Sequence, residues 1–191
     1  MINKILIILW FILRPKFYLH FLSMIKRKFL INHDTIENQR KAETWAATNA
    51  SSYISAFQKL GLKGDTVDLD INIINEAQKL EKSSSFKMGG AGHIDLLYNC
   101  TKLLKAQKVI ETGVAYGWSS LAILKAIHDI NFGKLYSVDM PYPRKNNEGD
   151  VGIVVPKYLK DNWLLIREPD RPGIIKAIER HGDLSDLDKK Q

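Results

Sequence analysis

The strongest constraint on the fold of this chain is a change of hydrophobic period that recurs in its second half. A short apolar run at 108–112 precedes a helical pattern over 118–130, which is followed by a second short run at 134–138. Two strands joined through a helix of this length form a right-handed parallel unit. A third run at 163–167 and a helical pattern around 174–178 add another strand and helix. The sequence therefore predicts an α/β fold built on a parallel sheet.

The residues before this alternation favour helices. Apolar side chains between 70 and 82 recur at helical spacing, although residues 67–73 also alternate as in a strand, and we favour the helix. Residues 93–105 carry a further amphipathic pattern. Upstream, we expect a polar stretch over 32–44 and then one helix over 45–60, which ends before a glycine.

Small and polar residues follow the first predicted strand and open the next helix. They read VIETGVAYGWSSLAIL at 109–124, and YSVDMP follows at 136–141. Gly113 allows a ligand to approach the backbone, and the N–H groups at the start of the helix can bind an anionic group. Asp139 ends the second strand, where a carboxylate can accept hydrogen bonds from the two hydroxyls of a ribose. The alternative is an ordinary tight turn with a surface acid.

Two common phosphate-binding motifs do not fit these residues. A dinucleotide fingerprint requires glycine at its first, third and sixth positions, which here are Gly113, Ala115 and Trp118. Trp118 would place an indole where helix and strand pack closely, so a dehydrogenase is disfavoured. A Walker phosphate loop is excluded because no Gly-Lys-Ser/Thr sequence ends the turn.

The same residues resemble the first motif of the class I S-adenosylmethionine-dependent methyltransferases, in the subgroup that reads ETG-x-A-x-G-x-SS. The resemblance implies S-adenosyl-L-methionine as the cofactor. It also implies that the acid of the motif orients the methionine amino group and that Asp139 holds the ribose hydroxyls. The small residues would lie beneath the sulfonium and carboxylate, or allow the turn into the helix, and one serine would donate near the carboxylate. The cofactor-binding residues implied are Glu111, Gly113, Ala115, Gly117, Ser119, Ser120 and Asp139.

The family pattern usually has glycine at Ala115, and its complete sheet has seven strands. This chain offers three apolar runs, and residues 182–191 are polar, so we expect the first three strands of a Rossmann-like sheet, truncated at the C-terminus. We expect a partial S-adenosylmethionine-binding domain over 93–191. A helical extension with a glycine-rich connector would occupy 32–92, and its connector at 88–92 is either a plain linker or a loop that closes over the cofactor.

The charge of the chain is concentrated in residues 1–31. This segment carries six of the Lys and Arg residues and no acid, while the whole chain has a net charge of +7. Nucleic-acid binding is therefore not expected of the main body. An apolar run at 5–13 is too short to span a membrane, so we expect a basic amphipathic segment that associates with an anionic membrane surface. The alternative is that its apolar residues pack on the body or on another subunit.

The remaining residues set the compartment and exclude a metal. Cys100 is the single cysteine, which permits no intrachain disulfide, and no small-residue cleavage pattern follows the apolar run. We expect a cytoplasmic protein, peripheral at the inner face of a membrane. Its five histidines have no metal-ligand spacing.

Two functions remain open at this stage. The first is methyl transfer to an oxygen or nitrogen of an unidentified small molecule or glycan. The second is a non-catalytic, membrane-associated interaction protein or truncated paralogue that retains the cofactor-binding half. Such a protein would self-associate or recruit a partner chain through the uncovered edge of its first strand.

Overall fold

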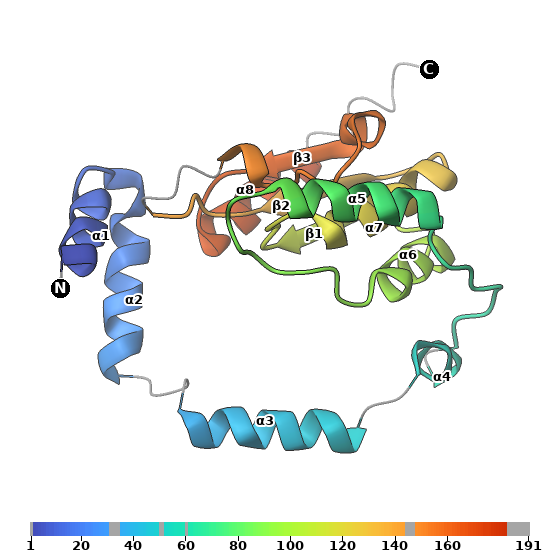
Figure 1. The fold of residues 1–191 in the computed structure, drawn as a ribbon, viewed down its shortest axis with the longest axis horizontal. Helices are drawn as coiled ribbons and strands as arrows, with labels where there is room; N and C mark the ends of the chain where they lie inside the picture. The colour runs from blue at the N-terminus through green and yellow to red at the C-terminus, as the bar shows by residue number, and fades with distance from the viewer. Residues whose placement is uncertain (1, 31–34, 50–51, 60, 144–147, 183–191) are drawn as a thin grey trace. The chain divides into compact units, whose positions relative to one another are not determined.

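The computed structural model describes the chain except for residues 1, 31–34, 50–51, 60, 144–147 and 183–191 (Figure 1). The chain divides into two compact units, residues 1–60 and 61–191. The division thus falls well before the expected boundary at residue 92. The expectation that the polar end of the chain adds no strand concerns residues 183–191, which lie outside the described residues.

The second unit is built on three parallel strands, β1 (Lys108–Thr112), β2 (Lys134–Val138) and β3 (Trp163–Ile166). Their order in the sheet is β1-β2-β3, and all pairs are parallel. The strands lie side by side in Figure 1. This arrangement confirms the predicted α/β, Rossmann-like fold class.

Helices cover both faces of the sheet. One face carries α7 (Trp118–Asp129), which supplies most of a core with Leu121, Ile127 and Leu135 fully buried. Helix α6 (Ile94–Leu103) packs along α7. The other face is covered by α8 (Asp170–Gly182), whose Ala177 is buried against the apolar side chains of β2 and β3. A sheet covered on both faces explains why the strands read as nearly continuous apolar runs.

The segment before α6 belongs to the same unit because it packs into the same core. Helix α5 (Ile71–Ser83) begins at Asp70, whose carboxylate accepts a hydrogen bond from the Asn72 N–H at 2.8 Å. Its Ala77 is buried in the α7 core. The helix that we favoured over a strand for this segment is confirmed.

Residues 67–69, which alternate like a strand, run extended beside α6 and are held by its side chains. The Asn99 amide accepts from the Val67 N–H at 3.0 Å and donates to the Val67 carbonyl at 2.8 Å. The Asp95 carboxylate accepts from the Leu69 N–H at 2.9 Å. These hydrogen bonds satisfy backbone groups that would otherwise need a sheet partner.

The first unit contains α1 (Ile2–Ile12), the short helix η1 (Pro15–Phe17), α2 (Tyr18–Leu30), α3 (Ile36–Asn49) and α4 (Tyr53–Lys59). The prediction of one helix over 45–60 after a polar stretch is wrong. Helix α3 already begins at Ile36, after Thr35 accepts a hydrogen bond from the Asn38 N–H at 3.2 Å. It buries no residue, so the apolar periodicity on which the prediction rested is absent there.

Candidate functional site

The turn between β1 and α7 leaves open space over Gly113. This residue has a φ of +76°, and its N–H donates to the Val138 carbonyl at 2.8 Å. A Cβ placed here would meet nothing within 4 Å. The positive φ favours glycine, and the space above it is available to a ligand at the carboxyl ends of the strands.

Gly117, the second glycine of the motif, has a different role. Its φ is +92°, and a Cβ here would lie 2.9 Å from the Cα of Gly152 and 3.0 Å from the Val155 side chain. Ala115, with a φ of +51°, accepts a hydrogen bond at its carbonyl from the Gly152 N–H at 2.9 Å. The glycine at 117 therefore permits the turn to pack against the segment before η3 (Lys157–Asn162).

Glu111 lies at the centre of a buried cluster of hydroxyl groups. Its carboxylate accepts hydrogen bonds from Ser120 and Ser137, both at 2.6 Å, and from Ser119. The side chain of Glu111 and that of Ser137 meet because the two residues are register partners in β1 and β2. Ser137 in turn accepts from the Trp163 indole N–H at 2.8 Å.

Three residues of the predicted cofactor site belong to this cluster. Glu111, Ser119 and Ser120 are brought together, and each serine hydroxyl directs its one hydrogen to the carboxylate. A hydroxyl has a single hydrogen to donate, so in this arrangement the serines have none left for a ligand. The cluster joins the ends of two strands to the first turn of α7.

Asp139 is the second buried acid at this end of the sheet. Its side chain forms an ion pair with Arg167, which follows β3 and also donates to the Asp139 backbone carbonyl at 2.9 Å. The other carboxylate oxygen lies 3.5 Å from the Val114 N–H. Arg167 makes two further hydrogen bonds, at 3.0 and 2.8 Å, to one oxygen of the exposed Glu148 carboxylate.

Tyr142 responds to this charge pair. Burial raises the pKa of Tyr142, and the neighbouring Asp139 carboxylate raises it further, while Arg167 opposes the rise. The phenol therefore stays protonated and able to donate a hydrogen bond.

The glycine-rich connector passes beside the turn. A Cβ at Gly89 would lie 3.8 Å from the Cβ of Ala115. The Tyr116 hydroxyl accepts from the Met88 N–H at 3.2 Å and donates to the Phe86 carbonyl. Tyr116 thus fixes the chain segment on both sides of Lys87 next to the predicted site.

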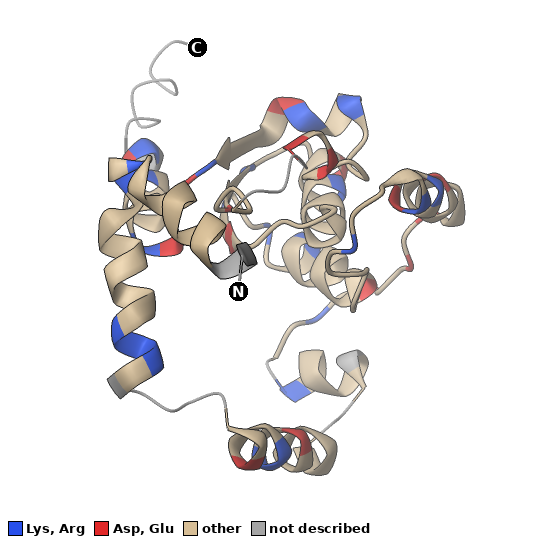
Figure 2. Cartoon of the chain, turned by 60° about the vertical axis from the view of Figure 1, so that its left-hand side comes forward, with Lys and Arg blue, Asp and Glu red and all other residues tan. Residues whose placement is uncertain are grey.

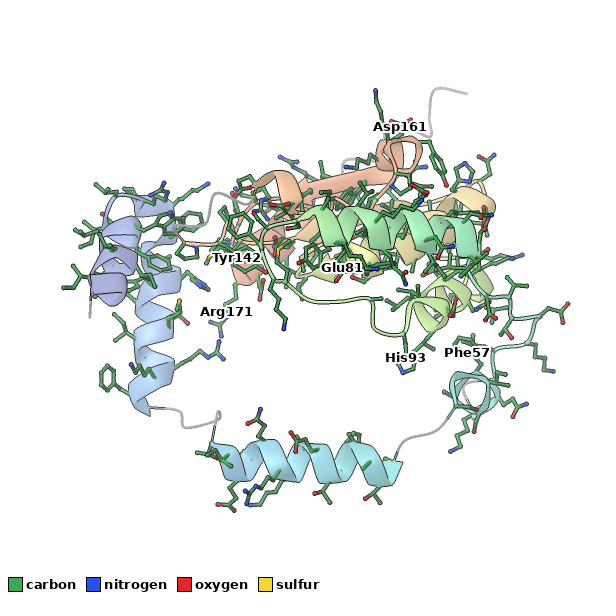
Figure 3. The ribbon with its side chains drawn as sticks, in the orientation of Figure 1. Phe57, Glu81, His93, Tyr142, Asp161 and Arg171 are labelled. Atoms are coloured by element: carbon green, nitrogen blue, oxygen red, sulfur yellow. The ribbon has the colours of Figure 1, made fainter. Side chains whose placement is uncertain are left out.

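Trp118, which breaks the dinucleotide fingerprint, is buried and donates from its indole to Glu81 of α5 at 2.7 Å. Figure 3 labels Glu81 on that helix. A pocket of about 580 Å³ adjoins this contact. Its lining comes from the end of α5, the segment after it and the motif: Gln78, Glu81, Lys82, Ser84, Ser85, Phe86, Lys87 and Tyr116.

The sequence prediction missed Arg167, Ser137, Trp163 and Tyr116. For Arg167 a signal existed, because a cation directly after the third strand lies at the same sheet edge as an acid directly after the second. The register partners Val138 and Ile166 place the two residues next to each other. Ser137 lies opposite Glu111 for the same reason. Within the described parts of the chain, no group of three His, Cys, Asp or Glu residues is placed to hold a metal ion.

Comparison with solved structures gives partial likenesses in backbone structure. No protein-family model and no curated protein matches the chain. SAH-bound methyltransferase PaMTH1 from Podospora anserina matches over 78% of this chain with 12% identity and a TM-score of 0.41. A protein assigned as an O-methyltransferase, from Klebsiella pneumoniae, matches over 72% with 13% identity and a TM-score of 0.35. The chain spans 65% and 55% of the lengths of these two proteins.

Proposed function

We propose that residues 61–191 bind S-adenosylmethionine at the turn between β1 and α7 and act in methyl transfer. The acceptor would be an oxygen or nitrogen of a small molecule or glycan. The observation that carries the proposal is the open space over Gly113 beside the buried carboxylate of Asp139. Backbone without a side chain and an acid at the next strand end are what a nucleoside ligand requires.

The residues present fit this cofactor in two places. The backbone at Gly113 and Ala115 has positive φ values, and a Cβ at Gly113 would meet nothing within 4 Å, so the methionine portion would have space there. Asp139 would supply acceptors for ribose hydroxyls, and the ion pair with Arg167 orients its carboxylate. When bound, the cofactor supplies a methyl group on a sulfonium.

Glu111 acts through the backbone in this proposal. Its three hydroxyl partners hold the ends of β1 and β2 and the start of α7 in one arrangement. The turn that faces the ligand is therefore preorganised, and binding need not order it.

The acceptor would enter beside Tyr116, where the connector and the end of α5 form the pocket of about 580 Å³. Methyl transfer depends mainly on aligning the acceptor with the sulfonium in a site that contains little water. The segment at 86–88, held by Tyr116, and the connector at 88–92 would exclude water on this side.

Calorimetric titration of the chain with S-adenosylmethionine and S-adenosylhomocysteine tests the proposal. We expect saturable heat for both, with binding lost in Asp139→Ala and in Gly113→Trp. The matched control is Asp161→Ala, because this exposed acid lies in η3, at the opposite end of β3 from Arg167 (Figure 3). Absence of heat from the parent chain would refute cofactor binding.

A second candidate function is favoured by the edge of the sheet. In the described part of the chain, β1 pairs with β2 alone, and its Ile110 side chain is 40% exposed on the face that α8 covers. A partner strand on this edge would pair the backbone and bury Ile110. Cofactor binding without methyl transfer to any acceptor, together with a stable complex lost in Ile110→Lys, would favour the interaction protein.

A further inference from the structure

The bend between α1 and α2 has a small aromatic core of its own. Phe11 and Phe17 are each 1% exposed. Trp10 stacks on Phe17 with ring centroids 5.2 Å apart, and Phe11 stacks on Phe21 at 4.9 Å. The two helices are bent by 110°, and no single described helix is long and apolar enough to cross a membrane. The bend is thus a packed turn between two helices that are long and apolar enough for a span only when taken together.

The backbone groups freed at the end of α1 all find partners near the bend. The Tyr18 hydroxyl donates to the Ile12 carbonyl at 2.6 Å, and the Arg14 guanidinium donates to the Trp10 carbonyl at 3.2 Å. The Arg14 N–H donates to the Phe11 carbonyl at 2.9 Å. A helix end in contact with water does not need such side-chain partners, whereas one in contact with lipid does.

Many apolar side chains of α1 and α2 stay exposed after the two helices have packed against each other. Leu19 is 83% exposed and Phe29 is 79% exposed. Exposed apolar side chains of this number on one short segment indicate a surface that is covered in use. The other exposed apolar side chains of this segment are those of Ile5, Ile7, Ile8, Leu9, Ile12, Leu13, Tyr18, Leu22, Met24 and Ile25.

Cations stand at both ends of α2. Arg14 and Lys16 lie at the bend, over the rings of Trp10 and Phe17, and Lys26, Arg27 and Lys28 fall near the end of the helix (Figure 2). A helix of 13 residues is about 20 Å long, against about 30 Å for the hydrocarbon core of a membrane. With charges at both ends, such a helix satisfies its cations only when it lies along a surface.

We propose that α1 and α2 form a hairpin that lies in the interface of an anionic membrane. Leu19, Leu22 and Phe29 enter the acyl boundary, and the cations meet headgroup phosphates. Charge complementarity selects this occupant, because residues 1–31 carry six cations and no acid. A second copy of the same surface would repel the first by its charge. The proposal is independent of cofactor binding.

Flotation of the full chain with vesicles tests the proposal. We expect binding to vesicles of phosphatidylcholine with phosphatidylglycerol, which added salt weakens, and little binding to phosphatidylcholine alone. Replacement of Lys26, Arg27 and Lys28 by Gln should lower the partition coefficient on the order of a hundredfold, since each cation near an anionic surface contributes about 1 kcal/mol.

Leu19→Glu with Leu22→Glu should abolish binding to the anionic vesicles. The matched control is Ile36→Glu with Trp45→Glu, which places the same two charges at exposed apolar residues of α3 and should leave binding unchanged. Equal partition of the parent and the variant with Leu19→Glu and Leu22→Glu would overturn the proposal. So would concentration-dependent self-association that this leucine variant removes while vesicle binding is absent.

A depth measurement separates the interfacial hairpin from a span. Cys100 is the single cysteine, so Cys100→Ser with Leu22→Cys allows one fluorescent label on α2. We expect quenching by lipids labelled near the headgroup to exceed quenching by lipids labelled at the chain end. The reverse order would overturn the interfacial placement.

Discussion

Glu111 and Asp139 are both buried acids at the carboxyl ends of neighbouring strands, yet different kinds of partner satisfy them. Three hydroxyl groups donate to Glu111, and they come from the packed elements β2 and α7. Asp139 depends chiefly on the guanidinium of Arg167, which is 22% exposed and shared with the exposed Glu148. The first arrangement leaves a ligand no hydroxyl hydrogen, whereas in the second Arg167 already has another carboxylate partner and Asp139 can exchange its own. We therefore expect Glu111 to stabilise the turn and Asp139 to contact a ligand.

The largest expected effect is the loss of the hydroxyl cluster. Glu111→Ala leaves the two buried hydroxyls of Ser120 and Ser137 and the half-buried one of Ser119 without this acceptor, and each unsatisfied buried group costs about 1–3 kcal/mol. We expect the free energy of unfolding to fall by at least about 2 kcal/mol, measured by urea denaturation. Glu179→Ala on the exposed face of α8 is the matched control and should change stability little. An unchanged midpoint for Glu111→Ala would contradict the role of the cluster.

Substitution of the two glycines of the motif should lower stability to different extents, because Gly117 packs against another segment and Gly113 faces open space. Gly117→Ala brings a Cβ to 2.9 Å from backbone and places Ala at positive φ, so strain and overlap add. Gly113→Ala meets open space, so only the backbone conformation costs about 1–2 kcal/mol. Thermal unfolding should show the larger loss for Gly117→Ala. Equal losses would mean that the contact with Gly152 relaxes freely.

Asp139→Asn should lower stability less than Glu111→Ala does. The amide of this variant leaves no buried charge without a partner, and Arg167 keeps Glu148 as a partner. Asp139→Asn should lower the affinity for S-adenosylhomocysteine at least tenfold, because hydrogen bonds to a charged acceptor contribute about 1.5–3 kcal/mol. Calorimetry on Asp139→Asn and on the control Asp161→Asn measures the difference. A stability loss as large as that of Glu111→Ala would erase the distinction between the two acids.

A third acid, Asp129, offers the smallest effect. Burial alone would raise the pKa of Asp129, but hydrogen bonds from Lys125, Tyr98 and His128 lower it. Its stabilisation is therefore present above the unfolded pKa and is lost as the pH falls through the folded pKa.

Burial, the hydrogen bond to Asp129 and the Asp129 charge together raise the pKa of Tyr98 to about 12. Asp129→Asn removes the charge, so the pKa of Tyr98 should fall toward 10. Carbon NMR of the labelled phenol would show this shift, and an unchanged Tyr98 pKa would contradict the contact.

The sequence predicted the strands and the α-helices of the second unit, though not η3, because burial there dictates the residue type. All three strands coincide with apolar runs, and α7 buries nearly its whole length. Helix α3 was not predicted because it buries no side chain, although Thr35 accepts a hydrogen bond from the Asn38 N–H at its start. Exposed helices leave little periodic signal.

The sequence predicted which residues lie at the candidate site better than it predicted what each of them does there. The motif placed Glu111, Gly113 and Asp139 at one end of the sheet, as strand ends in a parallel sheet must lie. The roles depended on pairing across strands, since Ser137 is the register partner of Glu111 and Arg167 follows the partner of Val138. Gly117 packs against Gly152, which lies 35 residues further along the chain. The local sequence around Gly117 does not predict this contact.

One paired measurement tests the central claim most directly: the S-adenosylhomocysteine affinity of Glu111→Gln and of Asp139→Asn, each well below its unfolding temperature. We predict that Glu111→Gln unfolds at a lower temperature but binds within a few-fold of the parent, whereas Asp139→Asn keeps its stability and loses at least tenfold in affinity. Loss of affinity in Glu111→Gln with parental affinity in Asp139→Asn would contradict the account.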